Sequence, residues 1–237
     1  MGSVLGLAIL ASAAGPEGAR PVSRIVSVRT ADGVVLQAEE WRPSPEAEPA
    51  AGILLIHSFG NSRKTWGEFP QVLARAGYLV LALDLRGHGE SPAVDDPERI
   101  LEDPALGPED LRAGLAWLRS SAGTDPSRLA VIGASVGANL ACVASGQGMV
   151  RTAVALSPHR DRVHLLAGGR PLHMTSVMFL ATSGDPGREA YARRLSLETR
   201  PPKEIKVFVR ASEHGEAILT AHPEASARIL DWLRRTL

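Results

Sequence analysis

The composition of this 237-residue chain is that of a globular protein with no excess of either charge. Hydrophobic residues make up 44% of the sequence and charged residues 22%, so the chain can bury one sizeable core in a single domain. Lys and Arg together number 26, as do Asp and Glu, and this balance provides no basic field for nucleic acid. Aromatic residues, at 4%, are too few to form platforms on which bases stack. The single cysteine, Cys142, excludes an internal disulfide framework and is expected to be a small buried packing residue.

The first residues of the chain have some features of an export signal. Residues 4–14 form an apolar run of about the length of a signal-peptide core, and the small residues at 11–13 are of the sort that precede a cleavage site. No Lys or Arg precedes this run, since Arg20 is the first basic residue, and the run is too short to span a membrane. We therefore assign residues 1–23 to an N-terminal extension or a possible signal segment, and residues 24–237 to a single domain. The sequence is compatible with either a cytoplasmic or an exported protein.

A β-hairpin is predicted at the start of the domain. Residues 25–29 and 34–38 are rich in apolar and β-branched side chains, and they flank Ala31-Asp32-Gly33, which contains the Asp-Gly pair typical of a tight turn. The first two strands are therefore expected to be antiparallel. The Pro-rich stretch at 42–49 indicates a surface loop rather than a linker between domains.

After the hairpin, strand-forming and helix-forming segments alternate along the chain. The predicted strands are residues 53–56, 78–83, 128–132, 152–157, 176–182 and 205–209. The predicted helices lie near 69–75, at 108–120, directly after residue 135, and from 223 to the C-terminus. This alternation predicts an α/β fold whose mostly parallel sheet is covered by helices on both faces.

The segment at 108–120 illustrates why these helices are expected to lie on the sheet. Pro108 occupies the first helical position, and acidic residues follow it near the positive end of the helix dipole. Leu111, Leu115 and Leu118 recur on one face of the helix. We expect that face to pack against the sheet.

The most informative motif is Gly133-Ala134-Ser135-Val136-Gly137, which lies between a predicted strand and a helical segment of small residues. A serine on so tight a turn needs glycine two residues away on either side, because a Cβ there would collide with the neighbouring strand or helix. The turn lifts the Ser135 hydroxyl clear of the sheet and directs the N-terminus of the helix toward any oxyanion that forms. Ser135 is therefore the candidate nucleophile.

A nucleophilic serine needs a histidine base and an acid that orients the base, and candidates for both follow in the sequence. Asp185 lies in a Gly- and Pro-containing turn at the carboxyl end of the predicted strand 176–182, and it is the candidate acid. His214 lies in the loop after the predicted strand 205–209, and it is the candidate base. Glu213 is a competing carboxylate, but it is adjacent to the base, so its side chain is expected to point away.

The other histidines are expected to have no catalytic role. His57, at the end of a predicted strand, is expected to be a hydrogen-bonded structural residue beneath the loop that follows it. His159, His164 and His173 lie in one stretch, but their spacing lacks the close pairing typical of zinc sites. We expect neither a metal nor another cofactor.

With these motifs, the sequence resembles the α/β-hydrolase superfamily over nearly its whole length, from about Arg24 to the C-terminus. The chain order Ser135, Asp185, His214 matches the order of the superfamily's catalytic triad. The resemblance implies an α/β-hydrolase fold with an N-terminal antiparallel hairpin.

Two further motifs carry the same resemblance. Residues 53–60 are similar to the family's oxyanion strand and its His-Gly-x-Gly loop, with Ser58 where glycine is usual. The resemblance implies that the backbone N–H groups of Phe59 and Val136 form the oxyanion hole. Residues 84–91, Asp-Leu-Arg-Gly-His-Gly-Glu-Ser, are similar to the turn after the family's fourth strand, where Arg86 would hold loops together by hydrogen bonds.

A short connection is expected where many relatives insert a helical cap. Only 18 residues, 158–175, separate two of the predicted strands. They suffice for a loop or a short helix and are too few for a separate lid domain. We therefore expect no cap domain and an open active site.

The resemblance implies a lidless serine carboxylesterase that hydrolyses small, short-chain esters through an acyl-enzyme. In size and layout the chain is similar to the dienelactone-hydrolase-like group, with serine in place of that group's usual cysteine nucleophile. A serine peptidase, thioesterase or acyltransferase would share every motif, because fold and triad determine the acyl-enzyme chemistry and not the acyl acceptor. A non-catalytic binding module of the same fold would normally have a broken triad. The expected partner is a small-molecule ester, with no nucleic acid and no membrane span, and the oligomeric state is left open.

Overall fold

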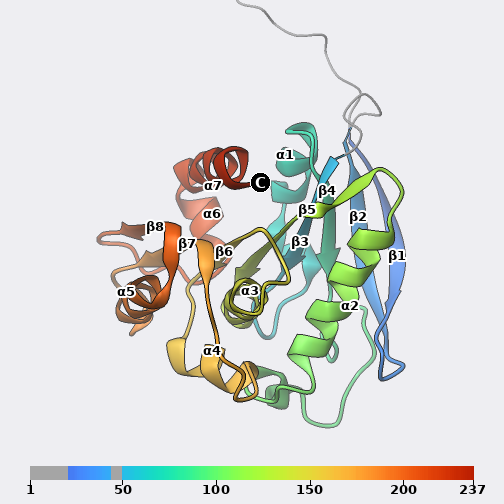
Figure 1. The fold of residues 1–237 in the computed structure, drawn as a ribbon, viewed down its shortest axis with the longest axis horizontal. Helices are drawn as coiled ribbons and strands as arrows, with labels where there is room; N and C mark the ends of the chain where they lie inside the picture. The colour runs from blue at the N-terminus through green and yellow to red at the C-terminus, as the bar shows by residue number, and fades with distance from the viewer. Residues whose placement is uncertain (1–20, 44–49) are drawn as a thin grey trace, which may run out of the picture.

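An eight-stranded sheet in the order β1-β2-β4-β3-β5-β6-β7-β8 runs through the molecule and carries helices on both faces (Figure 1). The computed structural model describes residues 21–43 and 50–237. The predicted α/β-hydrolase fold with a mostly parallel sheet is confirmed within these residues. The apolar run at 4–14, and with it the possible signal segment, lies outside the described residues, as does most of the Pro-rich stretch at 42–49.

The strands pair as the sequence predicts. They are β1 (Val22–Arg29), β2 (Val35–Arg42), β3 (Ala50–Ile56), β4 (Leu79–Leu83), β5 (Thr124–Ala134), β6 (Thr152–Leu156), β7 (Thr175–Thr182) and β8 (Arg200–Phe208). β1 pairs antiparallel with β2 and β2 antiparallel with β4, so the predicted hairpin is present. The pairs from β4–β3 through to β7–β8 are all parallel.

The last strand begins earlier than the predicted segment 205–209. β8 starts at Arg200 and includes Pro201 and Pro202, both exposed. Proline cannot donate to a strand ladder, so the sequence pattern favours a start after these residues. The structure accommodates them because β8 lies at the edge of the sheet, with β7 as its neighbour on one side.

The described residues form seven α-helices and two short 3₁₀ helices. They are α1 (Phe69–Arg75), α2 (Gly107–Ser120), α3 (Val136–Gly146), α4 (Arg160–Leu166), α5 (Arg188–Glu198), α6 (Ala217–Ala221), α7 (Pro223–Thr236), η2 (Arg63–Trp66) and η3 (Pro97–Leu101). The helices predicted from periodicity are all present. α4 is a seven-residue helix within the 18-residue connection, so the expectation of a short helix without a cap domain holds there.

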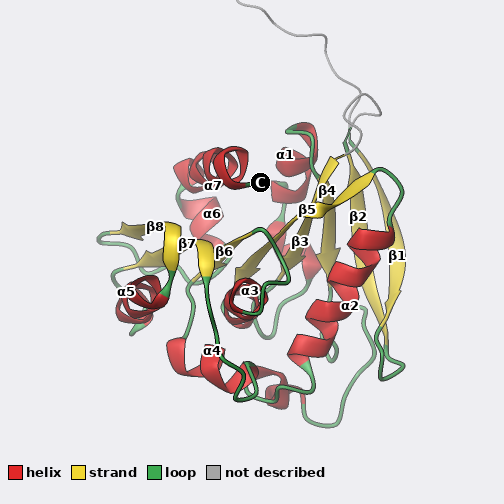
Figure 2. Cartoon of the chain, in the orientation of Figure 1, coloured by secondary structure: helices red, strands yellow, loops and turns green. Residues whose placement is uncertain are grey.

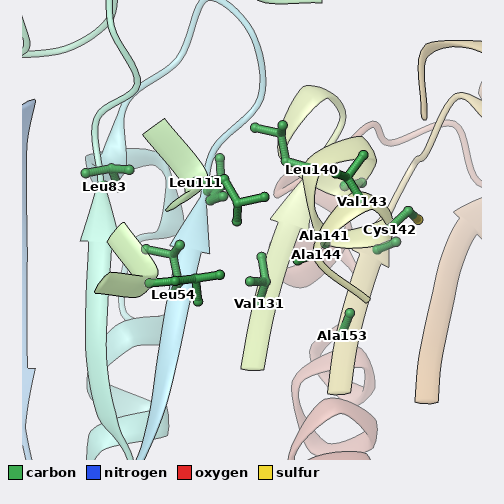
Figure 3. Packing of buried hydrophobic residues seen from close by; sticks show 14 of the residues in the cluster. Leu54, Leu83, Leu111, Val131, Leu140, Ala141, Cys142, Val143, Ala144 and Ala153 are labelled. Carbon is green, nitrogen blue, oxygen red and sulfur yellow. The ribbon is translucent and has the colours of Figure 1, made fainter. Parts of the chain in front are cut away.

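Helices cover both faces of the sheet (Figure 2). Beneath them, the central strands send alternate side chains into two apolar layers, one on each face. Leu54 of β3 lies in the layer beneath α2 and α3, whereas Leu55 lies in the layer beneath α1 and α7. Figure 3 shows the first of these layers, where Leu111 of α2 and Leu140 of α3 lie over the strands. Cys142 is fully buried in the same layer, as expected, and burial raises the pKa of its thiol.

The parallel strands bring their following loops to one edge of the sheet. Because β3 to β8 run in the same direction, the segments after their carboxyl ends meet at that edge, the usual place for a site in this class of fold. These segments contain all five residues predicted for the site.

None of the helices formed by the described residues is long and apolar enough to cross a membrane.

Candidate active site

Ser135 occupies a strained turn between β5 and α3. Its backbone has φ 54° and ψ −110°, a conformation that is rare for a residue with a side chain and costs on the order of 1–3 kcal/mol. Strain of this kind persists only where the surrounding structure enforces it, and it gathers at functional sites. The flanking residues are buried, whereas Ser135 is partly exposed. The turn therefore leaves Ser135 accessible to solvent between buried neighbours.

The two glycines of the motif make this turn possible. A Cβ on Gly133 would lie 1.9 Å from the carbonyl oxygen of Gly137. A Cβ on Gly137 would lie 2.0 Å from the carbonyl oxygen of Ile56 in β3. Both contacts involve backbone atoms that cannot move aside cheaply. The spacing of glycines around Ser135 thus follows from the closeness of three backbone segments.

His214 and Asp185 meet at the carboxyl ends of β8 and β7. His214 Nδ1 lies 2.6 Å from Asp185 Oδ2. The Asp185 side chain is buried, whereas the imidazole of His214 is 37% exposed. Because the ionised carboxylate can only accept, neutral His214 donates from Nδ1 and keeps a lone pair on Nε2. This is the tautomer that a general base requires.

The competing carboxylate, Glu213, is turned toward a different histidine. Its Oε2 lies 3.2 Å from Nε2 of His222, the residue directly before α7. Its backbone carbonyl accepts a hydrogen bond from Oγ1 of Thr182. The expected direction of the Glu213 side chain, away from the base, is therefore what the structure has.

The predicted oxyanion donors follow two strands that are hydrogen-bonded neighbours. Ile56 of β3 is paired with Gly133 of β5. Phe59 and Val136 each lie three residues beyond one member of this pair, so both follow the strands at the same edge of the sheet. Val136 is the first residue of α3, and the N–H groups of a first helical turn have no acceptor within the helix.

His57 is a structural residue beneath the loop that contains Phe59. Its Nδ1 lies 2.7 Å from the carbonyl oxygen of Ser58, and its Nε2 accepts a hydrogen bond of 3.1 Å from the backbone N–H of Leu85. Both ring nitrogens are therefore engaged with backbone, and Nδ1 is the donor. Burial lowers the pKa of His57, which keeps the ring neutral.

Glu216 is a residue of this region that sequence reasoning missed. Its carboxylate accepts hydrogen bonds of 2.7 Å from the backbone N–H of Ser58 and 2.6 Å from the Ser58 hydroxyl. The side chain is buried, although it directly follows Gly215 in the loop of the base. The available signal was Ser58 itself, since a hydroxyl where glycine is usual needs a hydrogen-bond partner.

The turn at residues 84–91 holds the neighbouring loops together. The carboxylate of Asp84 accepts a hydrogen bond of 2.6 Å from the backbone N–H of Arg63 and forms an ion pair with the Arg63 guanidinium. Arg86 donates to the buried carboxylate of Asp110 and to Asp32 in the hairpin turn, each at 2.7 Å. Arg86 thus joins its own turn to the hairpin turn and to α2, in keeping with the role that the family resemblance implies. Its hydrogen bonds lower the pKa of Asp32 to about 2.

The three histidines considered for a metal site have separate neighbours. The ring of His159 stacks on Tyr191, with 4.1 Å between the ring centroids. Nε2 of His164 lies 3.1 Å from Glu198, and the backbone N–H of His173 donates to Gly146. Within residues 21–43 and 50–237, no three His, Cys, Asp or Glu side chains gather in a way that could hold a metal ion.

Comparison with known proteins agrees with this fold. Residues 53–236 match the model of the alpha/beta hydrolase family. The chain therefore belongs to that family, and its general class is that of a hydrolase.

Similar proteins include one curated relative and two solved structures that bear on the fold. The chain is 29% identical over 136 residues to an uncharacterized protein of Mycobacterium tuberculosis, and this match covers 57% of the chain but only 44% of that protein. An esterase of Pyrococcus furiosus superimposes with a TM-score of 0.69 at 20% identity, covering 91% of this chain and 93% of the other. A dienelactone hydrolase from Anabaena variabilis superimposes with a TM-score of 0.73 at 21% identity, covering 92% and 100%. At these identities the two structures establish a shared fold.

Proposed function

We propose that the protein is a serine carboxylesterase that hydrolyses small, short-chain esters, and that residues 24–237 form its single catalytic domain. The observation that carries this proposal is the 2.6 Å contact between His214 and Asp185, at the sheet edge where the strained turn presents Ser135. A nucleophile, a base with a free lone pair and a buried orienting acid are the parts that acyl transfer needs.

In the proposed mechanism Ser135 is the nucleophile and His214 moves the protons. The Ser135 oxygen attacks the ester carbonyl carbon while its proton passes to Nε2 of His214. The backbone N–H groups of Phe59 and Val136 donate to the oxyanion of the tetrahedral intermediate. The intermediate collapses and expels the alcohol, which takes the proton from His214, and an acyl-enzyme remains.

Water completes the reaction by the same route. It attacks the acyl-enzyme as His214 removes its proton, and the second intermediate releases the acid and restores the Ser135 hydroxyl. Asp185 holds His214 in position throughout and stabilises the imidazolium that forms after each proton transfer.

A small substrate is favoured by the structure around the site. The connection between β6 and β7 contains only the seven-residue helix α4, which is too short to form a roof. A long acyl chain would therefore remain largely in water, and its additional methylenes would add little binding free energy.

Labelling with a fluorophosphonate tests the proposal directly. We expect the probe to attach to Ser135, as located by mass spectrometry of the digested protein, and we expect hydrolysis of short p-nitrophenyl esters by the same preparation. Absence of both labelling and hydrolysis would overturn the proposal in favour of a binding module with a hydrolase fold.

The same preparation distinguishes the other acyl-enzyme activities, which remain alternatives. Matched oxyester, thioester and peptide substrates with one acyl group compare the leaving groups, and added alcohol measures acyl transfer against hydrolysis. We expect the oxyester to have the highest kcat/KM and water to be the main acceptor. A preference for the thioester, the peptide or the alcohol would reassign the activity without changing the site.

A further inference from the structure

A buried carboxylate joins the loop of the base to the loop of the predicted oxyanion hole. Glu216 lies two residues after His214 and is 5% exposed. Its Oε1 lies 2.7 Å from the Ser58 nitrogen, and its Oε2 lies 2.6 Å from the Ser58 hydroxyl oxygen. Both carboxylate oxygens therefore bind the residue directly before Phe59.

The same carboxylate lies near the far end of that loop. Oγ1 of Thr65 is 3.2 Å from Glu216 Oε1 and 2.7 Å from the carbonyl oxygen of Ser62. The hydroxyl has one proton, and the shorter contact with Ser62 is the better bond. Ser58 is thus the main partner of Glu216, and Thr65 adds a weaker contact.

Close packing also holds the loop of His214 against the loop that contains Ser58. Gly215 has φ 59°, and a Cβ at this position would lie 2.4 Å from the Ser58 hydroxyl oxygen. Its backbone N–H donates a 3.1 Å hydrogen bond to the hydroxyl of Ser157 after β6. The base loop is therefore fixed on one side by Ser157 and on the other by Ser58.

We propose that Glu216 is a positioning residue that holds the Phe59 N–H in place for the oxyanion. This inference rests on the proposed esterase function. Ser58, where glycine is usual in the family, supplies the second of the two hydrogen bonds that the carboxylate accepts. Ser58 and Glu216 are accordingly one unit, and the departure from the family pattern at Ser58 has a structural reason.

The charge of Glu216 by itself would oppose the reaction. A carboxylate near a developing oxyanion raises the energy of the transition state, so any benefit must come from the position that its hydrogen bonds give to the loop. This separates the roles of charge and geometry. An amide of the same shape keeps the geometry and removes the charge, because Gln can accept from the Ser58 N–H and donate to the Ser58 hydroxyl.

Three variants measured for kcat and KM on p-nitrophenyl butyrate test the inference. Glu216→Ala is expected to lower kcat on the order of 100-fold with KM changed less than about threefold, since loss of one oxyanion donor costs 10²- to 10³-fold. Glu216→Gln is expected to stay within about threefold of the wild type in kcat. The control, Glu213→Gln, removes a carboxylate that is next to His214 in the sequence but contacts His222, and it is expected to leave both constants unchanged.

A loss of kcat in Glu216→Gln as large as that in Glu216→Ala would overturn the proposal, because charge and not position would then matter. A folded Glu216→Ala that retains kcat within twofold would overturn it as well, while the esterase assignment stands. If Glu216→Ala does not fold, Ser58→Ala removes one of the two hydrogen bonds and is expected to lower kcat by about tenfold at unchanged KM. An unchanged kcat in folded Ser58→Ala would contradict the proposal.

Hydrogen exchange measures the positioning independently of activity. In the wild type, amide exchange in a peptide covering residues 57–66 is expected to be slow. In Glu216→Ala or Ser58→Ala it is expected to accelerate at least about tenfold, whereas Glu216→Gln and Glu213→Gln are expected to match the wild type. Unchanged exchange in this peptide would overturn the positioning role of Glu216, whether or not the wild-type protein hydrolyses esters. Absence of ester hydrolysis by the wild type would instead refute the proposed esterase function.

Discussion

Asp185 and His214 come from the ends of neighbouring strands and meet with Oδ2 and Nδ1 2.6 Å apart, whereas Glu213, next to the histidine in sequence, faces His222. Backbone direction thus decides which carboxylate lies beside the His214 imidazole. Asp185→Asn is expected to lower kcat by about 10²- to 10⁴-fold, because the amide favours the wrong tautomer of His214 and cannot stabilise its cation. Glu213→Gln, measured on the same ester, is expected to keep full activity. A neutral Asp185→Asn would exclude it as the acid.

Removal of the nucleophile is expected to have a larger effect than removal of the acid. Ser135→Ala is expected to lower kcat on the order of 10⁴- to 10⁶-fold and to leave substrate binding little changed, because the residues around the nucleophile remain. Binding of a non-hydrolysable ester analogue, measured by calorimetry, provides the control. A loss of less than tenfold would contradict the assignment of Ser135.

Selectivity for acyl chain length is expected to level off early. Each methylene that stays in water forgoes about 0.8 kcal/mol of burial, so kcat/KM is expected to peak at acyl chains of roughly two to six carbons. p-Nitrophenyl esters from acetate to palmitate measure this dependence. Without a lid to open, the rate on tributyrin is expected to rise smoothly through its solubility limit. A preference for palmitate, or a sharp increase at saturation, would show that part of the chain covers the site.

The glycines of the serine turn are expected to differ in their tolerance of a methyl group from a glycine elsewhere in the core. Gly137→Ala would place Cβ 2.0 Å from the Ile56 carbonyl oxygen, and we expect a loss of more than about 3 kcal/mol in the free energy of unfolding. Gly114→Ala, in α2, meets the end of the Leu54 side chain at 2.9 Å. That side chain can move, and alanine gains about 1 kcal/mol of helix propensity, so the change is expected to be small. Urea unfolding of the two variants measures the difference.

Thiol reagents are expected to leave the enzyme active. Cys142 is fully buried and burial raises its pKa, so neither access nor thiolate is available in the folded protein. Iodoacetamide labelling, followed by mass spectrometry, is expected to appear only as urea unfolds the chain. Inactivation of the folded enzyme at the same rate as labelling would indicate a role for the thiol at the site.

Elements with a strong pattern were predictable from sequence, and elements held by distant contacts were not. α2 was predictable because Leu111, Leu115 and Leu118 recur at helical spacing, and the structure buries all three fully on one face. α5 was missed because only Ala192 and Leu195 of its side chains are buried, which leaves no clear apolar stripe. Its place in the fold depends on the sheet that it covers.

The candidate site follows the same distinction. Ser135 was predictable because its turn needs glycines at fixed spacing, and those glycines are visible in the sequence. Glu216 was not, because Ser58 indicates only that some hydrogen-bond partner is needed, and the partner lies 158 residues away in the sequence. A buried carboxylate in a loop becomes recognisable only when the fold brings its donors to it.

The two prolines of β8 also limit what can attach to the molecule. An added strand would need backbone donors along this edge of the sheet, and Pro201 and Pro202 have none. The register of β8 against β7 shifts between Thr175 and Val177, beside these prolines, which makes the edge less regular. Arg200 and Lys203 place positive charges on either side of them. The first part of β8 is therefore poorly suited to pair with an edge strand of a second molecule.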